Sequence, residues 1–325
     1  MKAALYDHYG AAREVLRVED VERPEPGPGQ VRARVELSGV NPTDWKCRSG
    51  ATPRPIDGFQ IPHHDGTGVI DAVGEGVDPG RVGQRVWLWL AAAANRWGTA
   101  AQWSVVPERH AVPLPGRASA ELGAGLGVPA MTAHRCLFAD GPVEGKTLLV
   151  AGGAGAVGHF AIELAKHAGA RVISTVSGPA KAELAGKAGA DLVVNYREPD
   201  AAGQISSFAG QGGVDCVVEL ALGANLALDL AVTGQGARIV TYAAEPADPT
   251  LPVRACMTAN VVLRFVLLYN VPAEALDQAA RDITAAVDAG TLTELPVTRF
   301  GLQEVAAAQE AVEANTVGRV LVAAG

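Results

Sequence analysis

The stretch that decides the fold lies at residues 147–169 and reads TLLVAGGAGAVGHFAIELAKHAG. Its first five residues are apolar and predict a buried strand, and apolar residues recur at helical spacing from Val157 onward. Between strand and helix, Gly153, Gly155 and Gly158 match the dinucleotide-binding pattern G-x-G-x-x-G in the context that it requires. Glycines are needed because a side chain would hold a pyrophosphate away from the N–H groups at the helix N-terminus. The stretch therefore predicts a Rossmann domain that binds a dinucleotide.

After this stretch the chain continues to alternate between strand and helix patterns. Further strands are expected at residues 171–176, 192–195, 214–220 and 237–241, with helices near 180–188, 202–209 and 225–232. Repeated βα units are typical of a parallel, doubly wound sheet. The apolar run at residues 261–269 is either one more strand or an edge strand used in dimerisation, and the sequence leaves both interpretations open.

The two ends of the chain carry different patterns. Strands separated by Pro- and Gly-rich turns are expected at residues 2–6, 15–21, 31–40, 68–73, 85–89, 100–105 and 111–114. This arrangement predicts a mostly antiparallel, barrel-like domain. The tail is expected to form a helix at 273–289, a strand at 296–299, a helix at 302–314 and a strand at 318–322, which could pack back on the first domain.

Composition narrows the classes of function. The 325 residues carry 35 acidic and 27 basic side chains, a net charge of -8, without a Lys/Arg run, so no nucleic-acid partner is expected. The apolar runs near the start are too short to span a bilayer, and Asp7 interrupts any signal peptide, so we expect a cytoplasmic protein without a membrane partner. The four cysteines are scattered and form no C-x-x-C pair, which favours neither a zinc ribbon nor a disulfide framework.

The residues after the second expected strand indicate which dinucleotide is bound. An NAD-preferring fold carries an acid there to bind the ribose 2′-OH, but residues 173–178 contain none. Ser177, Gly178 and Lys181 instead offer a hydroxyl, a backbone N–H and a cation, and Tyr196 follows the next strand. These groups suit a 2′-phosphate, so the sequence predicts NADPH.

Several segments together resemble a known family. They are SGVNPTD at 38–44, GTGVIDAVG at 66–74, GQRV at 83–86, VPAMTA at 128–133, the glycine turn and NYRE at 195–198. In their order and spacing the chain resembles the zinc-independent medium-chain dehydrogenases/reductases, specifically the quinone oxidoreductases similar to zeta-crystallin. The resemblance implies a GroES-like catalytic domain formed by residues 1–120 and 271–325, and a Rossmann domain formed by residues 121–270. It also implies that NADPH binds in the cleft between the domains and that the protein is a homodimer.

The resemblance further implies which residues form the site. Cofactor-binding positions are Asn41, Thr132, Gly153, Ala154, Gly155, Ala156, Val157, Ser177, Gly178, Lys181, Tyr196, Leu222, Tyr242, Ala243, Leu267, Leu268 and Arg319. Catalytic candidates are Asn41, His64 and Lys46, the last two as proton donors. Asp44 is a third possible donor, although a structural role in the turn after Asn41 is favoured.

No metal is expected. Zinc-dependent members of the superfamily bind zinc with Cys, His and Cys, and this chain has Asn41 and Val128 at the two cysteine positions. Only His64 remains, and zinc needs three or four convergent ligands. His63 and His64 are therefore expected to line the cleft or lie at the surface. Without a Lewis acid, alcohol oxidation is disfavoured, whereas a quinone or enone is electrophilic enough to accept hydride directly.

Three functions stay open on the sequence. The first is an NADPH-dependent quinone oxidoreductase. The second is a 2-alkenal or enoyl-thioester reductase on the same fold; an acyl carrier would then need a basic entrance, which Arg48, Arg54, Arg96 and Arg264 could form only if they cluster. The third is a non-catalytic, crystallin-like protein that binds NADPH.

Overall fold

The chain divides into two compact units. A computed structural model describes residues 1–245 and 247–325. The first unit contains Met1–Val128, Ala280–Ala289 and Glu294–Gly325, and the second contains Pro129–Ala279 and Gly290–Thr293. Residues from both ends of the chain thus belong to one unit. The expected domain boundaries, after residues 120 and 270, stay a prediction.

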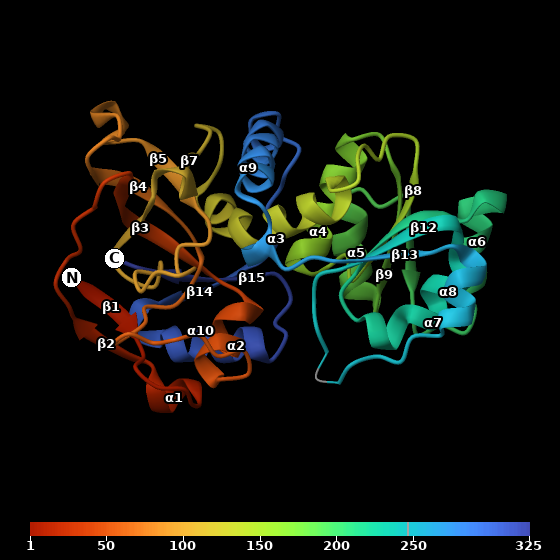
Figure 1. Ribbon diagram of the computed structural model, residues 1–325, viewed down its shortest axis with the longest axis horizontal. Helices are drawn as coiled ribbons and strands as arrows, with labels where there is room; N and C mark the ends of the chain where they lie inside the picture. Colours follow the sequence, from red (N-terminus) through yellow and green to blue (C-terminus); the bar gives the residue numbers. More distant parts are fainter. Residues whose placement is uncertain (246) are drawn as a thin grey trace. The chain divides into compact units, whose positions relative to one another are not determined.

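A six-stranded parallel sheet forms the centre of the second unit (Figure 1). Its strands are β8 (Thr147–Ala151), β9 (Arg171–Val176), β10 (Leu192–Asn195), β11 (Val214–Glu219), β12 (Thr233–Thr241) and β13 (Val262–Phe265). They lie in the order β10-β9-β8-β11-β12-β13, and every pairing is parallel. The predicted doubly wound sheet is confirmed, and the apolar run at 261–269 contributes its edge strand.

Helices surround this sheet in two groups. They are α4 (Ala156–His167), α5 (Pro179–Lys187), α6 (Ala201–Ala209), α7 (Leu222–Val232) and α8 (Val253–Ala259). Helices α4 and α5 contact each other and strands β8 to β10, whereas α7 contacts α6, α8, β11 and β12. Strand β8 is buried along its whole length, which explains its unbroken apolar sequence. All helices in residues 1–245 and 247–325 are too short or too polar to cross a membrane.

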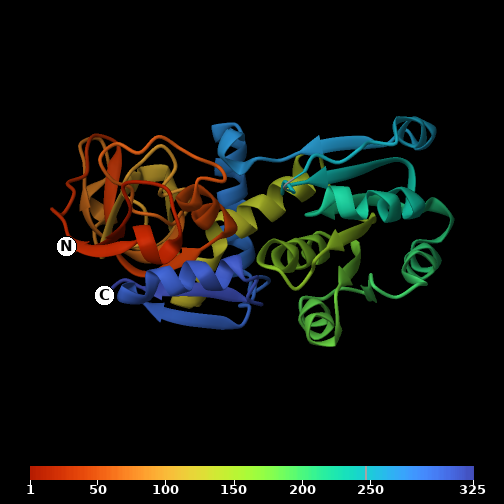
Figure 2. The same cartoon turned by 90° about the horizontal axis from the view of Figure 1, so that it is seen from below.

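The first unit contains a largely antiparallel sheet that both chain ends build. Its strands are β3 (Gln30–Val40), β4 (Asp65–Val73), β5 (Arg85–Leu88), β6 (Trp103–Pro107), β7 (Ala111–Pro113), β14 (Val297–Gly301) and β15 (Arg319–Ala323). The order is β14-β15-β3-β4-β5-β7, and β6 also pairs with β3. Strand β15 runs antiparallel beside β3, so the blue end of the ribbon lies against the N-terminal part (Figure 2). The mostly antiparallel fold predicted for this part of the chain is confirmed.

The remaining elements show where sequence patterns were insufficient. They are β1 (Lys2–Leu5), β2 (Arg17–Asp20), α1 (Ala12–Val15), α2 (Pro42–Ser49), α3 (Ala120–Phe138), α9 (Ala273–Asp288), α10 (Val305–Glu313) and the short helices Pro79–Arg81, Glu108–His110, Gly210–Gly212, Leu268–Asn270 and Leu302–Glu304. The strand expected at 15–21 is wrong at its start, because Val15 ends α1. The strand expected at 100–105 is instead β6, three residues later at its start. Helices α2, α3 and α8 were not predicted, and Pro129 inside α3 hides its helical pattern.

In the second unit, β11 and α7 each carry a buried acidic side chain. Glu219, the last residue of β11, accepts hydrogen bonds through Oε1 from the N–H groups of Leu220 and Ala221 and from Asn225. Asp229 on α7 is 1% exposed, and its Oδ2 has no hydrogen-bond partner among the described residues. Burial, with the nearby negative charge of Glu219, raises the pKa of Asp229 to about 8.

Asp229→Asn is therefore expected to stabilise the protein increasingly as the pH rises. The folded-state pKa of about 8 lies above the ordinary value of 3.8, so the folded chain holds a proton that the unfolded chain has lost. Stability then falls as the pH rises through this interval. The advantage of the variant in urea unfolding should grow by about 2 kcal/mol between pH 6 and pH 8.

The matched control is Glu183→Gln on the exposed face of α5. Its interaction with Lys187 lowers the pKa of Glu183, so the pH dependence of this substitution is confined to acidic pH and its effect should be the same at pH 6 and pH 8. An Asp229→Asn advantage that is equal at pH 6 and pH 8 would show that Asp229 titrates with an ordinary pKa.

Candidate functional site

The glycine turn after β8 is shaped by close backbone contacts. Gly152 has φ +68°, and the N–H groups of Gly152 and Gly153 donate to the carbonyl of Thr175 at 3.0 and 3.4 Å. A Cβ at Gly153 would lie 2.0 Å from Ser174 Oγ, and one at Gly158 would lie 2.4 Å from the Gly152 carbonyl. These glycines allow the turn to pack against β9 and α4.

The outer side of the same turn is open. A Cβ at Gly155 would meet no atom closer than 3.3 Å, and this residue is exposed. Gly155 is the N-cap of α4, so the helix begins with Ala156 and Val157 directly behind it. The first N–H groups of a helix have no partner inside the helix and attract an anion. Gly153, Ala154, Gly155, Ala156 and Val157 therefore form a cradle that fits a pyrophosphate.

The predicted 2′-phosphate residues follow two adjacent strands. Val176 and Asn195, the last residues of β9 and β10, are paired, and the N–H of Tyr196 donates to the Val176 carbonyl at 3.1 Å. This pairing brings Tyr196 beside the segment that starts with Ser177. A Cβ at Gly178 would meet nothing within 4 Å, and Lys181 lies in the first turn of α5. The structure thus brings all four predicted residues to one edge of the sheet, and they fit a 2′-phosphate.

Arg197 adds a cation that the sequence analysis did not assign. Its guanidinium lies 5.9 Å from the ring centroid of Tyr196. No Asp or Glu occurs between Arg171 and Lys181. The only indication of Arg197 in the sequence is its position next to Tyr196.

The other predicted cofactor residues of this unit follow the neighbouring strands. Leu222 begins α7 just after β11, Tyr242 and Ala243 follow β12, and Leu267 and Leu268 follow β13. Leu268 and Leu222 are buried, whereas Leu267 and Ala243 are exposed. Because all these strands are parallel, the residues share the carboxyl edge of the sheet, where ligands of this fold bind. Thr132 does not follow a strand of this sheet; it is buried within α3.

In the first unit, Asn41, Asp65 and Arg319 form a buried network. Asp65 Oδ2 accepts a hydrogen bond from Asn41 Nδ2 at 2.7 Å and faces Arg319 Nη2 at 3.4 Å. Arg319 Nη1 donates to Asn41 Oδ1 at 3.0 Å, and the N–H of Val128 donates to Asp65 Oδ1 at 2.7 Å. Burial raises the pKa of Asp65 to about 6, while Arg319 and the hydrogen bonds act in the opposite direction.

Strand ends and one glycine position this network. Asn41 follows β3, Asp65 begins β4 and Arg319 begins β15, and these three strands are neighbours. A Cβ at Gly127 would lie 2.1 Å from Asp65 Oδ1, so glycine permits α3 to approach the carboxylate. The resemblance identified Asn41 and Arg319, whereas no sequence pattern indicated the pairing of Asp65 with Arg319.

His64 lies in a small pocket of this unit. The pocket is lined by Tyr6, Asp44, Cys47, Arg54, Ile56, Gln60, Pro62, His63, His64 and Ala92. His64 Nε2 lies 3.3 Å from Arg54 Nη1, and burial, followed by the charge of Arg54, lowers the pKa of His64 to about 3. The imidazole is therefore neutral at physiological pH and accepts a hydrogen bond from the guanidinium.

The other two proton-donor candidates differ in position. Asp44 Oδ2 accepts a hydrogen bond from the N–H of Asn41 at 2.7 Å, which confirms its expected structural role, and the side chain also lines the pocket. Lys46 is not a lining residue, and its amine lies 5.8 Å from the centroid of the Trp45 ring. The catalytic roles of Asn41, His64 and Lys46 stay predictions.

The donor set does not fit zinc. His64 Nε2 accepts a hydrogen bond from Arg54. The carboxylate oxygens of Asp65 accept hydrogen bonds from Asn41 and Val128 and form an ion pair with Arg319. No group of three or more His, Cys, Asp or Glu side chains within residues 1–245 and 247–325 could hold a metal ion. Zinc requires three or four such ligands around one point. We therefore derive no step through a metal.

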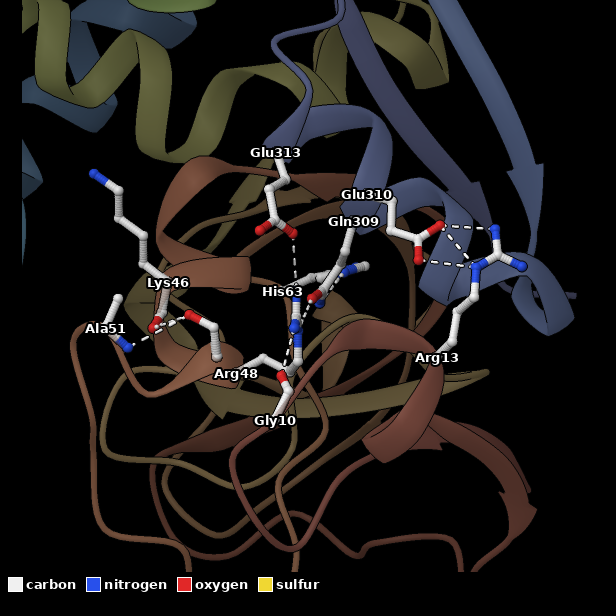
Figure 3. Close-up of polar contacts among 10 residues, drawn as sticks. Gly10, Arg13, Lys46, Arg48, Ala51, His63, Gln309, Glu310 and Glu313 are labelled. Carbon is white, nitrogen blue, oxygen red and sulfur yellow. Dashed lines mark hydrogen bonds and ion pairs between the residues drawn. The ribbon is translucent and has the colours of Figure 1, made fainter.

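His63 belongs to a chain of hydrogen bonds, called the relay here, which also contains Gln309 and Arg48 (Figure 3). It is fully buried with φ +76°, an uncommon conformation for a residue with a side chain, so the surface location considered for His63 and His64 is wrong. Gln309 on α10 faces His63 Nε2 at 3.3 Å, and Ser38 Oγ lies 2.9 Å from Nδ1. Because the amide of Gln309 donates to Nε2, the proton of the imidazole resides on Nδ1.

The relay continues in both directions from His63. Ser38 donates to Thr99 Oγ1 at 2.7 Å, and Thr99 donates to the backbone carbonyl of Asp65 at 2.5 Å. On the other side, the Oε1 atom of Gln309 accepts from Arg48 Nε at 3.1 Å, and Arg48 is 1% exposed. The relay therefore connects helices α2 and α10 to the backbone of Asp65.

Comparisons with known proteins agree with this architecture. The family model described as "Alcohol dehydrogenase GroES-like domain" matches residues 27–116, and the model described as "Zinc-binding dehydrogenase" matches residues 156–285. The quinone oxidoreductase of Lama guanicoe is 30% identical over 312 residues, which are 95% of this chain and 93% of that protein.

Solved structures give the same picture. A mycobacterial protein in complex with NADPH is 29% identical with a TM-score of 0.86 and covers 99% of both chains. An NAD-dependent alcohol dehydrogenase is 26% identical with a TM-score of 0.90 and covers both chains completely. The two proteins differ in cofactor: the first is bound to NADPH, and the second is NAD-dependent.

Gln309→Leu is expected to destabilise the protein by about 2 kcal/mol, because it leaves buried polar atoms of His63 and Arg48 without partners. Urea unfolding measures the change. The control is Glu310→Ala on the same helix, which removes only a surface ion pair with Arg13 and should cost less than about 1 kcal/mol (Figure 3). Equal losses in the two variants would mean that the relay adds nothing to stability.

Proposed function

Because the chain belongs to the quinone oxidoreductase family of medium-chain dehydrogenases/reductases, we propose that it is an NADPH-dependent quinone oxidoreductase that transfers hydride directly to its acceptor. The family is a quinone- or enone-type oxidoreductase family, and the quinone is the acceptor that we favour within it. The proposal includes a mechanism without zinc.

One observation carries the choice of cofactor. Ser177, Gly178, Lys181 and Tyr196 come together after β9 and β10, and the segment from Arg171 to Lys181 contains no carboxylate. A carboxylate would repel a 2′-phosphate, whereas a lysine and a hydroxyl stabilise it. The NADPH that the mycobacterial relative binds is the cofactor that this group of residues suits best.

Different parts of the protein bind different parts of the cofactor and the acceptor. NADPH, when bound, supplies the hydride. The glycine turn before α4 holds the pyrophosphate, and the residues after β9 and β10 hold the 2′-phosphate. A quinone is already electrophilic, so the main contributions of the protein are to orient the acceptor and to exclude water.

A proton must also reach the reduced acceptor. His64 is neutral and accepts a hydrogen bond from Arg54, which makes it a poor donor. Asp44 lines the same pocket, and burial raises its pKa well above the usual range, so its carboxyl group holds a proton to higher pH than an exposed acid. Lys46, the third candidate, does not line the pocket. Asp44 is therefore the proton donor that we favour.

The arginines give little support to an enoyl-thioester enzyme. Arg48 is buried, and Arg96 and Arg264 are paired with Asp57 and Asp140. The positive charge that an acyl carrier would need is thus largely neutralised. A 2-alkenal reductase stays the alternative acceptor class, and a non-catalytic NADPH-binding protein stays the alternative of another class.

The function is tested by following NADPH consumption by the purified, EDTA-treated protein. The acceptors are simple quinones, 2-alkenals and an enoyl-CoA, and NADH is tested in parallel because an NAD-dependent alcohol dehydrogenase has a similar fold. We expect turnover of quinones with NADPH preferred over NADH. Turnover of alkenals alone would transfer the assignment to an enone reductase, and tight NADPH binding without turnover would favour the non-catalytic alternative.

Lys181→Ala is expected to raise the KM for NADPH about tenfold, since it removes one charge-assisted contact worth about 1.5 kcal/mol. The KM for NADH should change less than about twofold, because NADH has no phosphate at that position. The control is Lys187→Ala on the same helix, where the amine pairs with Glu183 at the surface. Equal effects of Lys181→Ala on both cofactors would refute the assignment of the 2′-phosphate site.

We also propose that the protein is cytoplasmic and that it forms a homodimer through the edge strand β13. Val262, Phe265 and Leu267 in and beside this strand are 49%, 70% and 56% exposed, which is unusual for large apolar side chains on a sheet edge.

A further inference from the structure

The pocket beside His64 contains a guanidinium group for which the family resemblance gave no catalytic role. Arg54 lies between α2 and β4, is half-buried and lines the pocket together with Asp44, His64 and Tyr6. Among the described lining residues it is the one permanently charged cation. Two contacts hold it from opposite ends: the hydroxyl of Tyr9 donates to its backbone carbonyl, and His64 Nε2 lies 3.3 Å from its Nη1.

The proposed reaction creates a negative charge on an oxygen atom. A hydride brings one hydrogen and two electrons to a quinone, so a hydroquinone monoanion forms and one proton completes the hydroquinone. With an enone, the hydride forms a carbon–hydrogen bond at the β-carbon and the electron pair moves to the carbonyl oxygen as an enolate, which one proton then neutralises. In a water-poor pocket such an anion requires a fixed donor or a cation.

Two other cations of this unit do not line the pocket. Arg319 is paired with Asp65 in the buried network, and the amine of Lys46 lies over Trp45. Arg54 is the permanently charged cation among the described lining residues, and it lies there beside His64.

We propose that Arg54 is a catalytic residue that stabilises the oxyanion formed on the acceptor, and that His64 is the positioning residue that holds its guanidinium. The proposal rests on the proposed function, but it applies equally to a quinone and to an enone. It also gives His64 a different role from the one that the sequence suggested. A neutral imidazole whose Nε2 accepts a hydrogen bond orients the guanidinium rather than donating a proton.

A guanidinium suits this role for physical reasons. It stays protonated at all relevant pH values and offers five N–H donors in one plane. The contact with His64 uses one of these donors and fixes the plane of the group. A donor fixed before the reaction needs little reorganisation when the charge develops.

The first test measures charge stabilisation without turnover. 4-Nitrophenol serves as the probe because its anion resembles a hydroquinone monoanion and has its own visible absorption band. Binding to the wild-type protein should lower the pKa of the phenol by about one unit or more, since a nearby cation favours the anion. Arg54→Gln should abolish the shift. The matched control Arg96→Gln should retain it, because Arg96 pairs with Asp57 outside the pocket lining.

The second test measures the reaction. With the acceptor that the wild-type protein turns over, Arg54→Ala should lower kcat about 100-fold and change KM less than about threefold, because the contact develops in the transition state. Added guanidinium ion should restore part of the lost activity to Arg54→Ala and should have no such effect on wild type or Arg96→Gln. His64→Ala should lower kcat less than Arg54→Ala does.

The outcomes separate this inference from the proposed function. A phenol pKa that is lowered on binding to Arg54→Gln as much as on binding to the wild-type protein, or an Arg54→Ala variant that raises only KM, would overturn the role of Arg54. If the wild-type protein lowers the phenol pKa through Arg54 but reduces only alkenals, the oxyanion site stands and the quinone assignment fails. Circular dichroism of the variants verifies that they are folded.

Discussion

The buried ion pair between Asp65 and Arg319 is the interaction on which the first unit depends. It joins the first residue of β4 to the first residue of β15, and Asn41 at the end of β3 bonds to both side chains. Removing one partner of such a pair leaves an uncompensated buried charge and costs about 3–5 kcal/mol. The same pair also fixes Asn41 and, through the N–H of Asn41, the start of α2 and the position of Asp44. One electrostatic contact therefore places the tail of the chain, the central strands and one wall of the pocket.

The glycine turn and the strand patterns were sufficient to predict the parallel sheet of the second unit. Its central strands are recognised from short apolar runs, because strands of a parallel sheet are buried on both faces. Helix α2 was missed although its signal was present: Asn41, Pro42 and Asp44 form a typical helix start. Helix α3 was missed because Gly123, Gly125, Gly127 and Pro129 are unfavourable for a helix in isolation. Two of these glycines are explained by close approach, since side chains there would meet Leu114, Thr67 or Asp65.

Sequence reasoning predicted the candidate residues of the two units to different extents. The residues proposed to hold the pyrophosphate and the 2′-phosphate are local in the sequence and follow strand ends, so motif and topology together bring them to one edge. The residues around His64 come from distant positions: Gln309 lies 246 residues from His63, and Arg54 contacts His64 through a loop without regular structure. The periodicity of apolar residues carries no information about contacts between residues so far apart in the sequence. The tautomer of His63 and the neutrality of His64 are likewise properties of burial and neighbours, which only the folded chain reveals.

The pairing of β15 with β3 has a consequence for biosynthesis. The last strand of the sheet in the first unit consists of Arg319–Ala323, close to the end of a chain of 325 residues. While the chain is being translated, β3 therefore lacks one neighbour until residues 319–323 have been synthesised, whereas the second unit is complete after residue 293. Domains generally fold as units during synthesis, and unpaired strand edges in nascent chains promote association with other chains. The second unit is thus able to fold while one edge of the sheet in the first unit is still unpaired.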